Sequence, residues 1–277
     1  MTTTTPQIIL ITGASSGIGA ACARHLASLG HRVYGTSRRA PEPGDAEPNG
    51  DGIAMIRMDV TDEASVQRGV AHVVEREGRL DVLLNGAGDG IAGAVEDTTM
   101  DEARAQLDTN FFGALATCRA VLPVMRAQGD GLIVNVSSIG GGIGLPFQAL
   151  YSASKFALEG MTEALRIEAR PYGVRVVLVE PGDMRTGFTE NRRLTAANTE
   201  GSPYYAACQR AVEVMAHDEM NGASPELVAR LMVRIMASRS PRLRYMVGPI
   251  MEQVAWHLKH LLPGRVFEAG VRLYYKV

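Results

Sequence analysis

A glycine-rich turn near the start of the chain limits the possible folds more than any other feature. It follows the apolar run Ile-Ile-Leu-Ile-Thr at residues 8–12, and a helical pattern begins directly after it. Gly13, Gly17 and Gly19 are spaced so that one makes the turn, one admits a pyrophosphate and one lets the helix pack on the sheet. A glycine cluster alone is also compatible with an ordinary strand-to-helix turn. Because both flanks are present, the sequence predicts a dinucleotide-binding unit with the anion at the helix N-terminus.

Short apolar runs recur along the chain, and stretches with helical periodicity separate them. This alternation predicts an α/β fold: a Rossmann-type, doubly wound parallel sheet of about seven strands in three layers, αβα. Residues 40–52 are so rich in proline, glycine and acids that we expect an exposed loop there instead of a helix. The expected strands are residues 8–12, 32–36, 53–58, 82–85, 132–136, 175–179 and 243–247.

The composition is that of one enzyme-sized domain. The chain has 277 residues, 46% of them hydrophobic, and a net charge of −2, so residues 1–277 are expected to form a single domain with no electrostatic reason to bind nucleic acid. Its three cysteines are widely spaced and odd in number, which argues against disulfides and favours a reducing, cytoplasmic location. No apolar run reaches the roughly 18 residues of a membrane-spanning helix, so no membrane span is expected.

A second pattern carries chemistry. Tyr151 and Lys155 are four residues apart, so on a helix their side chains share one face. A free tyrosine has a pKa of about 10, and a nearby cation lowers it towards the range where the phenol serves as a general acid or base. The pattern alone more often marks two surface residues of an amphipathic helix. Only three of the 28 basic residues are lysines, which makes a lysine at this position harder to attribute to chance.

Together, these motifs resemble the short-chain dehydrogenase/reductase family over residues 8–248, in the family's order. One position departs from the family pattern: Gly86 stands where asparagine or alanine is more usual. The matching motifs are TGASSGIG at 12–19, DVTD at 59–62, NGAG at 85–88, TNFFG with Asn110, VSS at 136–138, YSASK at 151–155 and PGDMRT at 181–186.

The resemblance implies a hydride-transfer enzyme and four catalytic residues. Tyr151 would exchange a proton with the substrate oxygen, and Ser138 would donate a hydrogen bond to the same oxygen. Lys155 would lower the pKa of the tyrosine and hold the nicotinamide ribose. Asn110 would anchor a water that relays protons to Lys155. The histidines are scattered and no cysteine or acid cluster accompanies them, so no metal is expected.

The resemblance also implies the cofactor contacts, and the second strand indicates which cofactor. That strand ends in Gly-Thr-Ser-Arg-Arg without the acid that would bind an unphosphorylated ribose. Ser37, Arg38 and Arg39 suit a 2′-phosphate, which predicts NADP(H). Because most of the basic residues are arginines, the alternative is that Arg38 and Arg39 are surface residues without a role in cofactor binding. The other expected contacts are Gly13, Ser15, Ser16, Gly17, Ile18, Gly19, Asp59, Val60, Asn85, Ala87, Gly88, Tyr151, Lys155, Pro181, Gly182, Met184 and Thr186.

Apolar residues in two segments indicate the substrate. Residues 187–223 are the expected substrate lid, and residues 249–277 are an expected helical extension like that of the retinol and hydroxysteroid dehydrogenase branch. We therefore expect a hydrophobic secondary alcohol and ketone, or primary alcohol and aldehyde. A 3-oxoacyl-thioester ketoreductase and a non-catalytic cofactor sensor are the alternatives. The lid side chains expected in the pocket are Phe188, Leu194, Tyr204, Tyr205, Met215 and Met220.

A homodimer or homotetramer is the expected assembly. The helical stretches 100–127 and 151–169 resemble those that pair between subunits in the family, and they carry Phe111, Phe112, Phe156 and Leu158. The apolar stripe of residues 250–262 is expected to pack on the body or on a partner subunit, with a membrane surface as the alternative.

Overall fold

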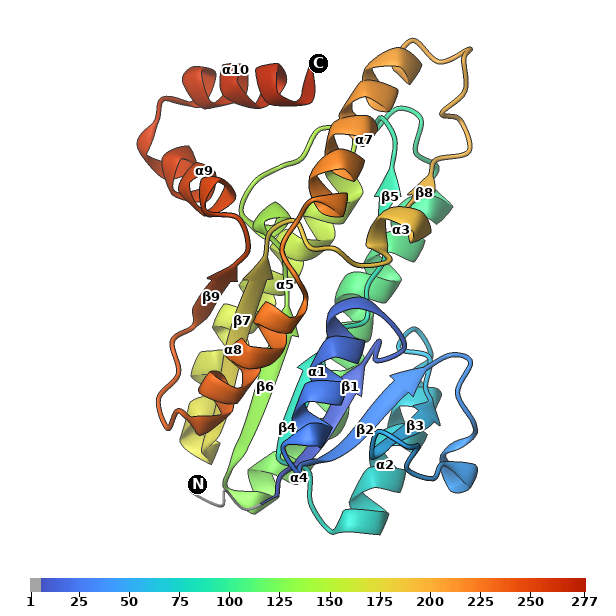
Figure 1. The fold of residues 1–277 in the computed structure, drawn as a ribbon, viewed down its shortest axis with the longest axis vertical. Helices are drawn as coiled ribbons and strands as arrows, with labels where there is room; N and C mark the ends of the chain where they lie inside the picture. The colour runs from blue at the N-terminus through green and yellow to red at the C-terminus, as the bar shows by residue number, and fades with distance from the viewer. Residues whose placement is uncertain (1–5) are drawn as a thin grey trace.

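The computed structural model describes residues 6–277 and is built on a seven-stranded sheet (Figure 1). The strand order is β3-β2-β1-β4-β6-β7-β9, and every pair of neighbours is parallel. This confirms the predicted doubly wound parallel sheet. The strands are β1 (Ile8–Thr12), β2 (Arg32–Ser37), β3 (Ile53–Arg57), β4 (Val82–Asn85), β6 (Gly131–Val136), β7 (Val174–Pro181) and β9 (Arg244–Val247).

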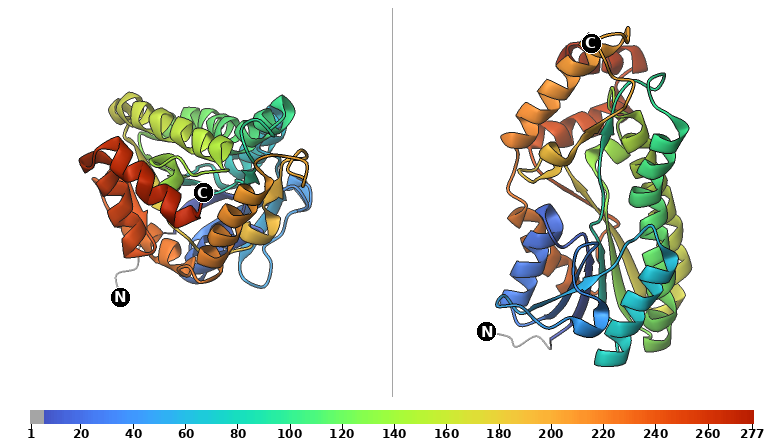
Figure 2. Two further views of the ribbon diagram at one scale, coloured as in Figure 1. Left: turned by 90° about the horizontal axis from the view of Figure 1, so that it is seen from above. Right: turned by 90° about the vertical axis from the view of Figure 1, so that its right-hand side faces the viewer.

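Helices cover both faces of this sheet, as Figure 2 shows with the sheet seen nearly edge-on in its right panel. Helices α1 (Gly17–Ser28) and α8 (Glu226–Ala237) pack on one face, against alternate strand residues such as Ile9 and Ile11. Leu10 points the other way, into the core under the helices of the second face. Those helices are α2 (Glu63–Glu77), α4 (Gly113–Gln128) and α5 (Ala149–Ala169).

The strand order reverses at β1, which pairs with β2 on one side and with β4 on the other. In open α/β sheets the ligand site lies outside the carboxyl ends of the strands at such a switch point. The loops that follow β1, β4, β6 and β7 meet at this edge, which is uppermost in Figure 1. The fold therefore places the predicted motifs at one edge of the sheet.

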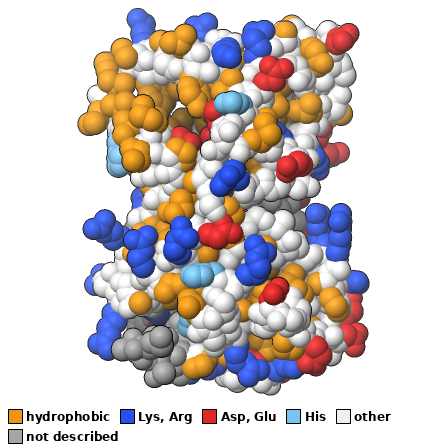
Figure 3. Space-filling view, in the orientation of Figure 1, with side chains coloured by type: hydrophobic (Ala, Val, Ile, Leu, Met, Phe, Trp, Pro, Cys, Tyr) orange, Lys and Arg blue, Asp and Glu red, His pale blue; other side chains and the backbone are white. Residues whose placement is uncertain are grey.

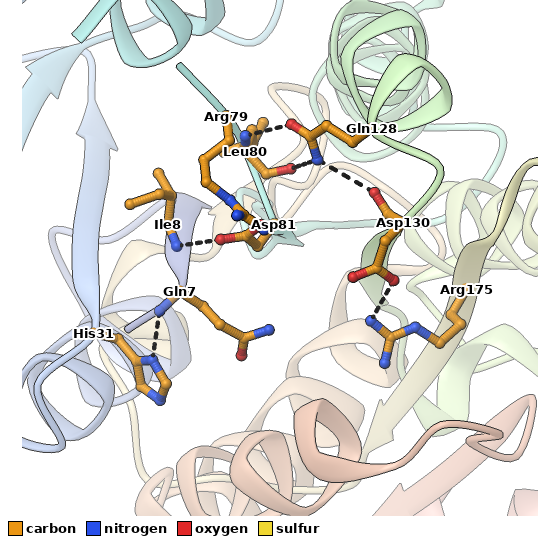
Figure 4. A network of polar contacts seen from close by, with 9 residues as sticks. All are labelled: Gln7, Ile8, His31, Arg79, Leu80, Asp81, Gln128, Asp130 and Arg175. Carbon is orange, nitrogen blue, oxygen red and sulfur yellow. Dashed lines mark hydrogen bonds and ion pairs between the residues drawn. The ribbon is translucent and has the colours of Figure 1, made fainter. Parts of the chain in front are cut away.

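Polar contacts hold the opposite edge of the sheet together (Figure 4). Asp81 is only 3% exposed, and its carboxylate accepts from the Ile8 backbone N–H at 2.8 Å and from Arg79 Nε at 2.8 Å. The Gln128 side chain accepts from the Leu80 N–H at 2.8 Å and donates to the Leu80 carbonyl at 2.9 Å. These contacts join the starts of β1 and β4 to the end of α4.

The later parts of the chain rise above the ligand edge. Figure 1 shows α7 on one side of this upper region and α9 and α10 on the other. A short parallel pair, β5 (Ile91–Ala92) and β8 (Arg193–Leu194), lies apart from the main sheet. The remaining helices are α3 (Met100–Leu107), α6 (Phe188–Asn191), α7 (Tyr205–Met220), α9 (Ile250–Leu261) and α10 (Gly264–Tyr275). None of the helices within residues 6–277 has both the length and the apolarity to cross a membrane.

Three details differ from the sequence-based expectations. Residues 40–52 form no α-helix, but Ala46 is buried among the residues packed on α2, so the loop is only partly exposed. The helical stretch 100–127 is divided by a five-residue π-helical turn, Asp108–Phe112, between α3 and α4. Leu158 is fully buried in its own subunit, because it lies on the inner face of α5, and is not available for contact between subunits.

Candidate active site

The turn after β1 accepts only glycine at two of its positions. Gly13 has a φ of +70°, and a Cβ there would lie 2.8 Å from the Ala87 Cα. A Cβ on Gly19 would overlap the carbonyl oxygen of Gly13. The Thr12 hydroxyl accepts from the N–H groups of Gly86 and Ala87, both at 3.0 Å. The first turn is thus fastened to the loop that follows β4.

The N-terminus of α1 is open to an anion. Ser16 is the N-cap residue, yet its side chain makes no capping hydrogen bond, and the first turn of the helix holds no acid. Gly17 has a φ of +53°, and a Cβ there would press on the Thr186 side chain at 3.3 Å. Ser15 is exposed and Ile18 faces the cavity described below. Free backbone N–H groups beside glycines fit the diphosphate of a dinucleotide.

The ends of β2 and β3 bring the predicted ribose contacts together. Arg38 and Arg39 are exposed directly after β2, and the Arg39 N–H donates to the Ser37 hydroxyl at 3.1 Å. Asp59 accepts from the backbone and the hydroxyl of Thr61, at 3.0 and 2.8 Å, which fixes the turn that carries Val60. These side chains form one polar corner beside the turn of β1.

The side chain of Asn85 faces away from this corner. It donates to Asn135 Oδ1 at 2.9 Å and accepts from the Thr117 hydroxyl at 2.6 Å, under helix α4. Asn85 and Asn135 are register partners on β4 and β6. The side chain therefore holds the helix to the sheet. Of residues 85–88, Gly86 and Gly88 line the cavity of the candidate site, whereas Ala87 packs against the core.

Tyr151 and Lys155 lie in the first two turns of α5, and both side chains are buried. Lys155 Nζ lies 5.8 Å from the centroid of the Tyr151 ring and donates to the Val136 carbonyl at 2.9 Å. A Cβ on Gly140 would lie 3.2 Å from the Tyr151 ring and 3.4 Å from Ser138 Oγ. A tyrosine, a serine and a lysine from separate motifs thus gather around one point.

Burial dominates the acidity of these groups. It raises the pKa of Tyr151 to about 12, an effect that the Ser138 hydroxyl opposes and the Glu219 charge reinforces. Burial also lowers the pKa of Lys155 to about 8, although the Asp89 charge acts the other way. The predicted lowering of the Tyr151 pKa is not seen in this arrangement, because burial of the phenol has the largest effect and raises that pKa. The Lys155 ammonium donates instead to the Val136 carbonyl beside the ring.

Asn110 lies on the π-helical turn, a feature often found at functional sites. Its Nδ2 donates to the Asp89 carbonyl at 3.0 Å and to the Ser154 hydroxyl at 3.1 Å, and its Oδ1 accepts from the Asp89 N–H at 3.0 Å. A Cβ on Gly88 would lie 3.2 Å from Asn110 Oδ1 and 3.8 Å from Lys155 Nζ. Asn110 and Lys155 therefore both lie beside Gly88, and nothing in the sequence context of Asn110 pointed to Asp89 as its partner.

A cavity of about 460 Å³ opens above these residues. Its floor includes Ser138, Tyr151 and Lys155, together with Pro181, Gly182, Met184 and Thr186 from the end of β7. The Phe188 ring packs edge-on to Tyr151, with 5.6 Å between the centroids. Figure 3 shows hydrophobic side chains around a hollow in this upper region of the molecule. The apolar wall from the C-terminal helices comprises Met251, Ala255, Leu258, Leu262, Val266, Phe267 and Val271.

The predicted lid supplies fewer side chains to the cavity than expected. Of its six named residues only Phe188 and Met215 line the cavity, whereas Leu194, Tyr204 and Met220 are exposed and Tyr205 lies outside the lining. The reason is that α9 and α10 occupy the space above the site. Their amphipathic pattern was visible in the sequence, but a pattern does not say which surface a helix covers.

Four carboxylates also reach the cavity. Two of them have partners: Glu219 pairs with Arg192 and accepts from the Thr189 hydroxyl at 2.5 Å, and Asp218 accepts from the Tyr274 hydroxyl at 2.6 Å. The other two lie together, since the Asp183 N–H donates to Glu252 Oε2 at 2.9 Å. Burial raises the pKa of both carboxyls, and the charge of Glu252 adds to this effect on Asp183, as the charge of Asp218 does on Glu252. Sequence reasoning did not single out these residues, and within residues 6–277 no such cluster has the arrangement of a metal site.

Chemically, the site combines a proton donor, a hydroxyl and a cation at the base of an apolar cavity, next to a turn that fits a dinucleotide. A phenol and a hydroxyl directed at one point suit the oxygen of a carbonyl or an alcohol. The arrangement is therefore that of an oxidoreductase acting on a carbon–oxygen bond.

Comparisons with known proteins agree. The family model described as short chain dehydrogenase matches residues 7–197. A 3-ketodihydrosphingosine reductase of Bacteroides thetaiotaomicron is 42% identical over 98% of this chain and 99% of its own length. The crystal structure of a short-chain dehydrogenase from Streptomyces avermitilis, 32% identical, superposes with a TM-score of 0.80 over 99% of this chain and 97% of that one. A Burkholderia phymatum short chain dehydrogenase/reductase in complex with NAD is 26% identical, with a TM-score of 0.80 over 94% of this chain and 95% of that one. The chain therefore belongs to the short-chain dehydrogenase/reductase family and is an oxidoreductase.

Proposed function

We propose that this chain is an NADP(H)-dependent reductase that interconverts a long-chain ketone and its secondary alcohol. The observation that carries the proposal is the position of Tyr151 and Ser138 at the base of a cavity walled by apolar side chains of α9 and α10. A ketone oxygen that meets the two hydroxyls would leave its aliphatic chain against this wall. Burial of such a chain contributes roughly 0.8 kcal/mol for each methylene group.

The chain's own residues would hold the cofactor and handle the proton. Gly13, Gly17 and Gly19 fit the diphosphate, and the loop residues Pro181, Gly182, Met184 and Thr186 fit the nicotinamide end. When bound, the reduced nicotinamide supplies the hydride. Tyr151 donates a proton to the ketone oxygen, and Ser138 holds that oxygen with a hydrogen bond. Lys155 and Asn110, which both lie beside Gly88, would pass protons on to Tyr151.

Three donors, a half-buried serine and two exposed arginines, support the choice of NADP(H). Ser37, Arg38 and Arg39 follow β2, and no acid is present there to accept from a free ribose. Guanidinium groups match a phosphate through charge-assisted hydrogen bonds. Asp59 is occupied with its own turn, so it does not replace the missing acid.

The cavity and one relative support a long-chain ketone. The relative with 42% identity over nearly its whole length is named as a reductase of 3-ketodihydrosphingosine, a ketone with a long aliphatic chain. A 3-oxoacyl-thioester is the alternative substrate. We favour the free ketone, because apolar side chains of α9 and α10 wall the cavity and the relative is named for a free ketone. Both Tyr151 and Lys155 are present, which disfavours a cofactor sensor without activity.

A spectrophotometric assay tests the proposal. Purified protein is mixed with NADPH and, in separate reactions, with a long-chain 3-ketone, a steroid ketone, a retinal and an acetoacetyl thioester. We expect the long-chain ketone to give the highest kcat/KM, at least about tenfold above the others. Higher kcat/KM with the thioester would favour the alternative, and no oxidation of NADPH with any ketone would refute the proposal.

A further inference from the structure

The cavity is acidic for a site that takes an apolar substrate. Four carboxylates line it, and Lys155 is the one lysine or arginine among the described lining residues. Two of the carboxylates are satisfied by Arg192 and by the Tyr274 hydroxyl. Asp183 and Glu252 instead face each other, and the described part of the chain offers neither of them an ion pair. An acid pair that lacks a cation is costly in a buried site.

A second, independent feature of the cavity wall points to a polar ligand. Gln148 is only 3% exposed, lines the same cavity and precedes Tyr151 by three residues. Its Nε2 finds no hydrogen-bond partner within residues 6–277. Buried amide groups in native proteins are normally hydrogen-bonded, so this donor indicates a ligand oxygen.

The acid pair lies within electrostatic reach of the reacting group. Asp183 follows Gly182 at the end of β7, and its charge is among those that oppose ionisation of Tyr151. Glu252 lies in the first turn of α9 and reaches back to the Asp183 backbone. Asp183 and Glu252 line the same cavity as Tyr151 and Ser138, so a cation one carbon away from a ketone held by those two hydroxyls would share that cavity with both carboxylates.

We propose that Asp183 and Glu252 bind an ammonium group on the carbon next to the ketone, so that the substrate is a long-chain α-amino ketone. Gln148 donates to an oxygen of the same polar head. This inference rests on the proposed function and names its substrate class. The substrate in the name of the Bacteroides relative has this chemistry, because its ketone carbon adjoins a carbon that carries an amine.

The test compares two ketones of equal chain length, one with the amine and one without it. The readout is the ratio of their kcat/KM values. Because a hydrogen bond to a charged group is worth roughly ten- to a hundredfold in affinity, we expect the unmodified protein to favour the amine by at least about tenfold. Asp183→Asn and Glu252→Gln should each lower the ratio roughly tenfold or more. Glu268→Gln, an exposed acid on α10 outside the cavity, is the matched control and should leave the ratio unchanged.

Each outcome decides between the two proposals. Equal kcat/KM values for the two ketones in the unmodified protein would overturn this inference and leave the proposed function standing. A ratio that Asp183→Asn and Glu252→Gln both leave unchanged would also overturn it. If neither ketone is reduced, the proposed function fails. Calorimetric binding of dodecylamine and dodecanol then tests the acid pair alone, with at least about tenfold tighter binding of the amine expected and equal binding contradicting it. If a variant does not fold, the same titration of the unmodified protein decides the case.

Discussion

The ammonium of Lys155 lies 5.8 Å from the centre of the Tyr151 ring and donates its hydrogen bond to the carbonyl of Val136. The two side chains are buried together, and burial disfavours the charged form of each. Tyr151 therefore keeps its proton at neutral pH, which is the form that a reductase needs to donate it. In the reverse reaction Tyr151 must accept a proton. Interactions with bound ligands would then have to lower the pKa of Tyr151 towards that of Lys155.

Tyr151→Phe should abolish turnover and leave cofactor binding nearly unchanged. The substitution removes the transferable proton and retains the ring that packs on Phe188. General acid catalysis contributes roughly 10²- to 10⁴-fold in rate. Turnover is measured with the best ketone, and binding by nicotinamide fluorescence. More than a tenth of the original activity in the Phe variant would show that another group donates the proton.

Lys155 should make the stability of the protein rise with pH in a defined window. Its pKa is about 8 in the folded protein against 10.5 ordinarily, so between these values the unfolded chain binds more protons than the folded one. Stability therefore increases as the pH rises through this window. In Lys155→Met that contribution should be absent, as measured by urea unfolding at about pH 7.5 and about pH 9.5. If the stability of both proteins depended on pH in the same way, the pKa of Lys155 would not be lowered in the folded protein.

Asp81→Ala should destabilise the fold without changing the active site. The carboxylate is buried and accepts from the Ile8 N–H, so its loss leaves that donor without a partner at the start of β1. A hydrogen bond to a charged group contributes about 1.5–3 kcal/mol, and we expect a loss of this size in the free energy of unfolding. The exposed Asp51→Ala serves as the control, with a change within about 0.5 kcal/mol. A loss no larger than that of the control would mean that water replaces the carboxylate.

The sequence was sufficient to predict the parts of the molecule that local patterns determine. Most strands of the central sheet are short runs of buried apolar residues, and the glycine turn requires its glycines for steric reasons. The spacing of Tyr151 and Lys155 placed both on one face of α5. These features depend on residues within one or two turns of each other.

Features that join distant segments were not predictable in this way. The contact between Asp183 and Glu252 spans 69 residues, and it exists only because α9 folds back over the end of β7. The direction of the Asn85 side chain depends on which face of β4 meets α4. The π-helical turn that carries Asn110 adds a residue to a helix whose apolar spacing gives no sign of it.

The chain should form a homodimer or homotetramer through α4 and α5. Phe112 is 50% exposed, and Ile167 is 75% exposed on the outer side of α5. Exposed large apolar side chains on neighbouring helices suit an interface. Light scattering should give at least twice the 29.7 kDa of one chain, and Phe112→Arg should lower that mass. Leu29→Arg, which changes an exposed leucine at the end of α1, is the control and should not change it. A mass of one chain at micromolar concentration would contradict the prediction.

Arg38 should account for most of a preference for NADPH. The end of β2 carries the donors of Ser37, Arg38 and Arg39 and no acid, so a 2′-phosphate finds partners there and a free ribose does not. A charge-assisted contact of this kind contributes about 1.5–3 kcal/mol, or roughly ten- to a hundredfold in affinity. Arg38→Asp should therefore weaken NADPH binding at least tenfold and strengthen NADH binding, because a carboxylate repels the phosphate and accepts from the ribose hydroxyls. Arg39→Ala is the matched variant, and we expect a smaller effect. The dissociation constants are measured by nicotinamide fluorescence. Equal values for NADH and NADPH in the unmodified protein would show that neither arginine selects the cofactor.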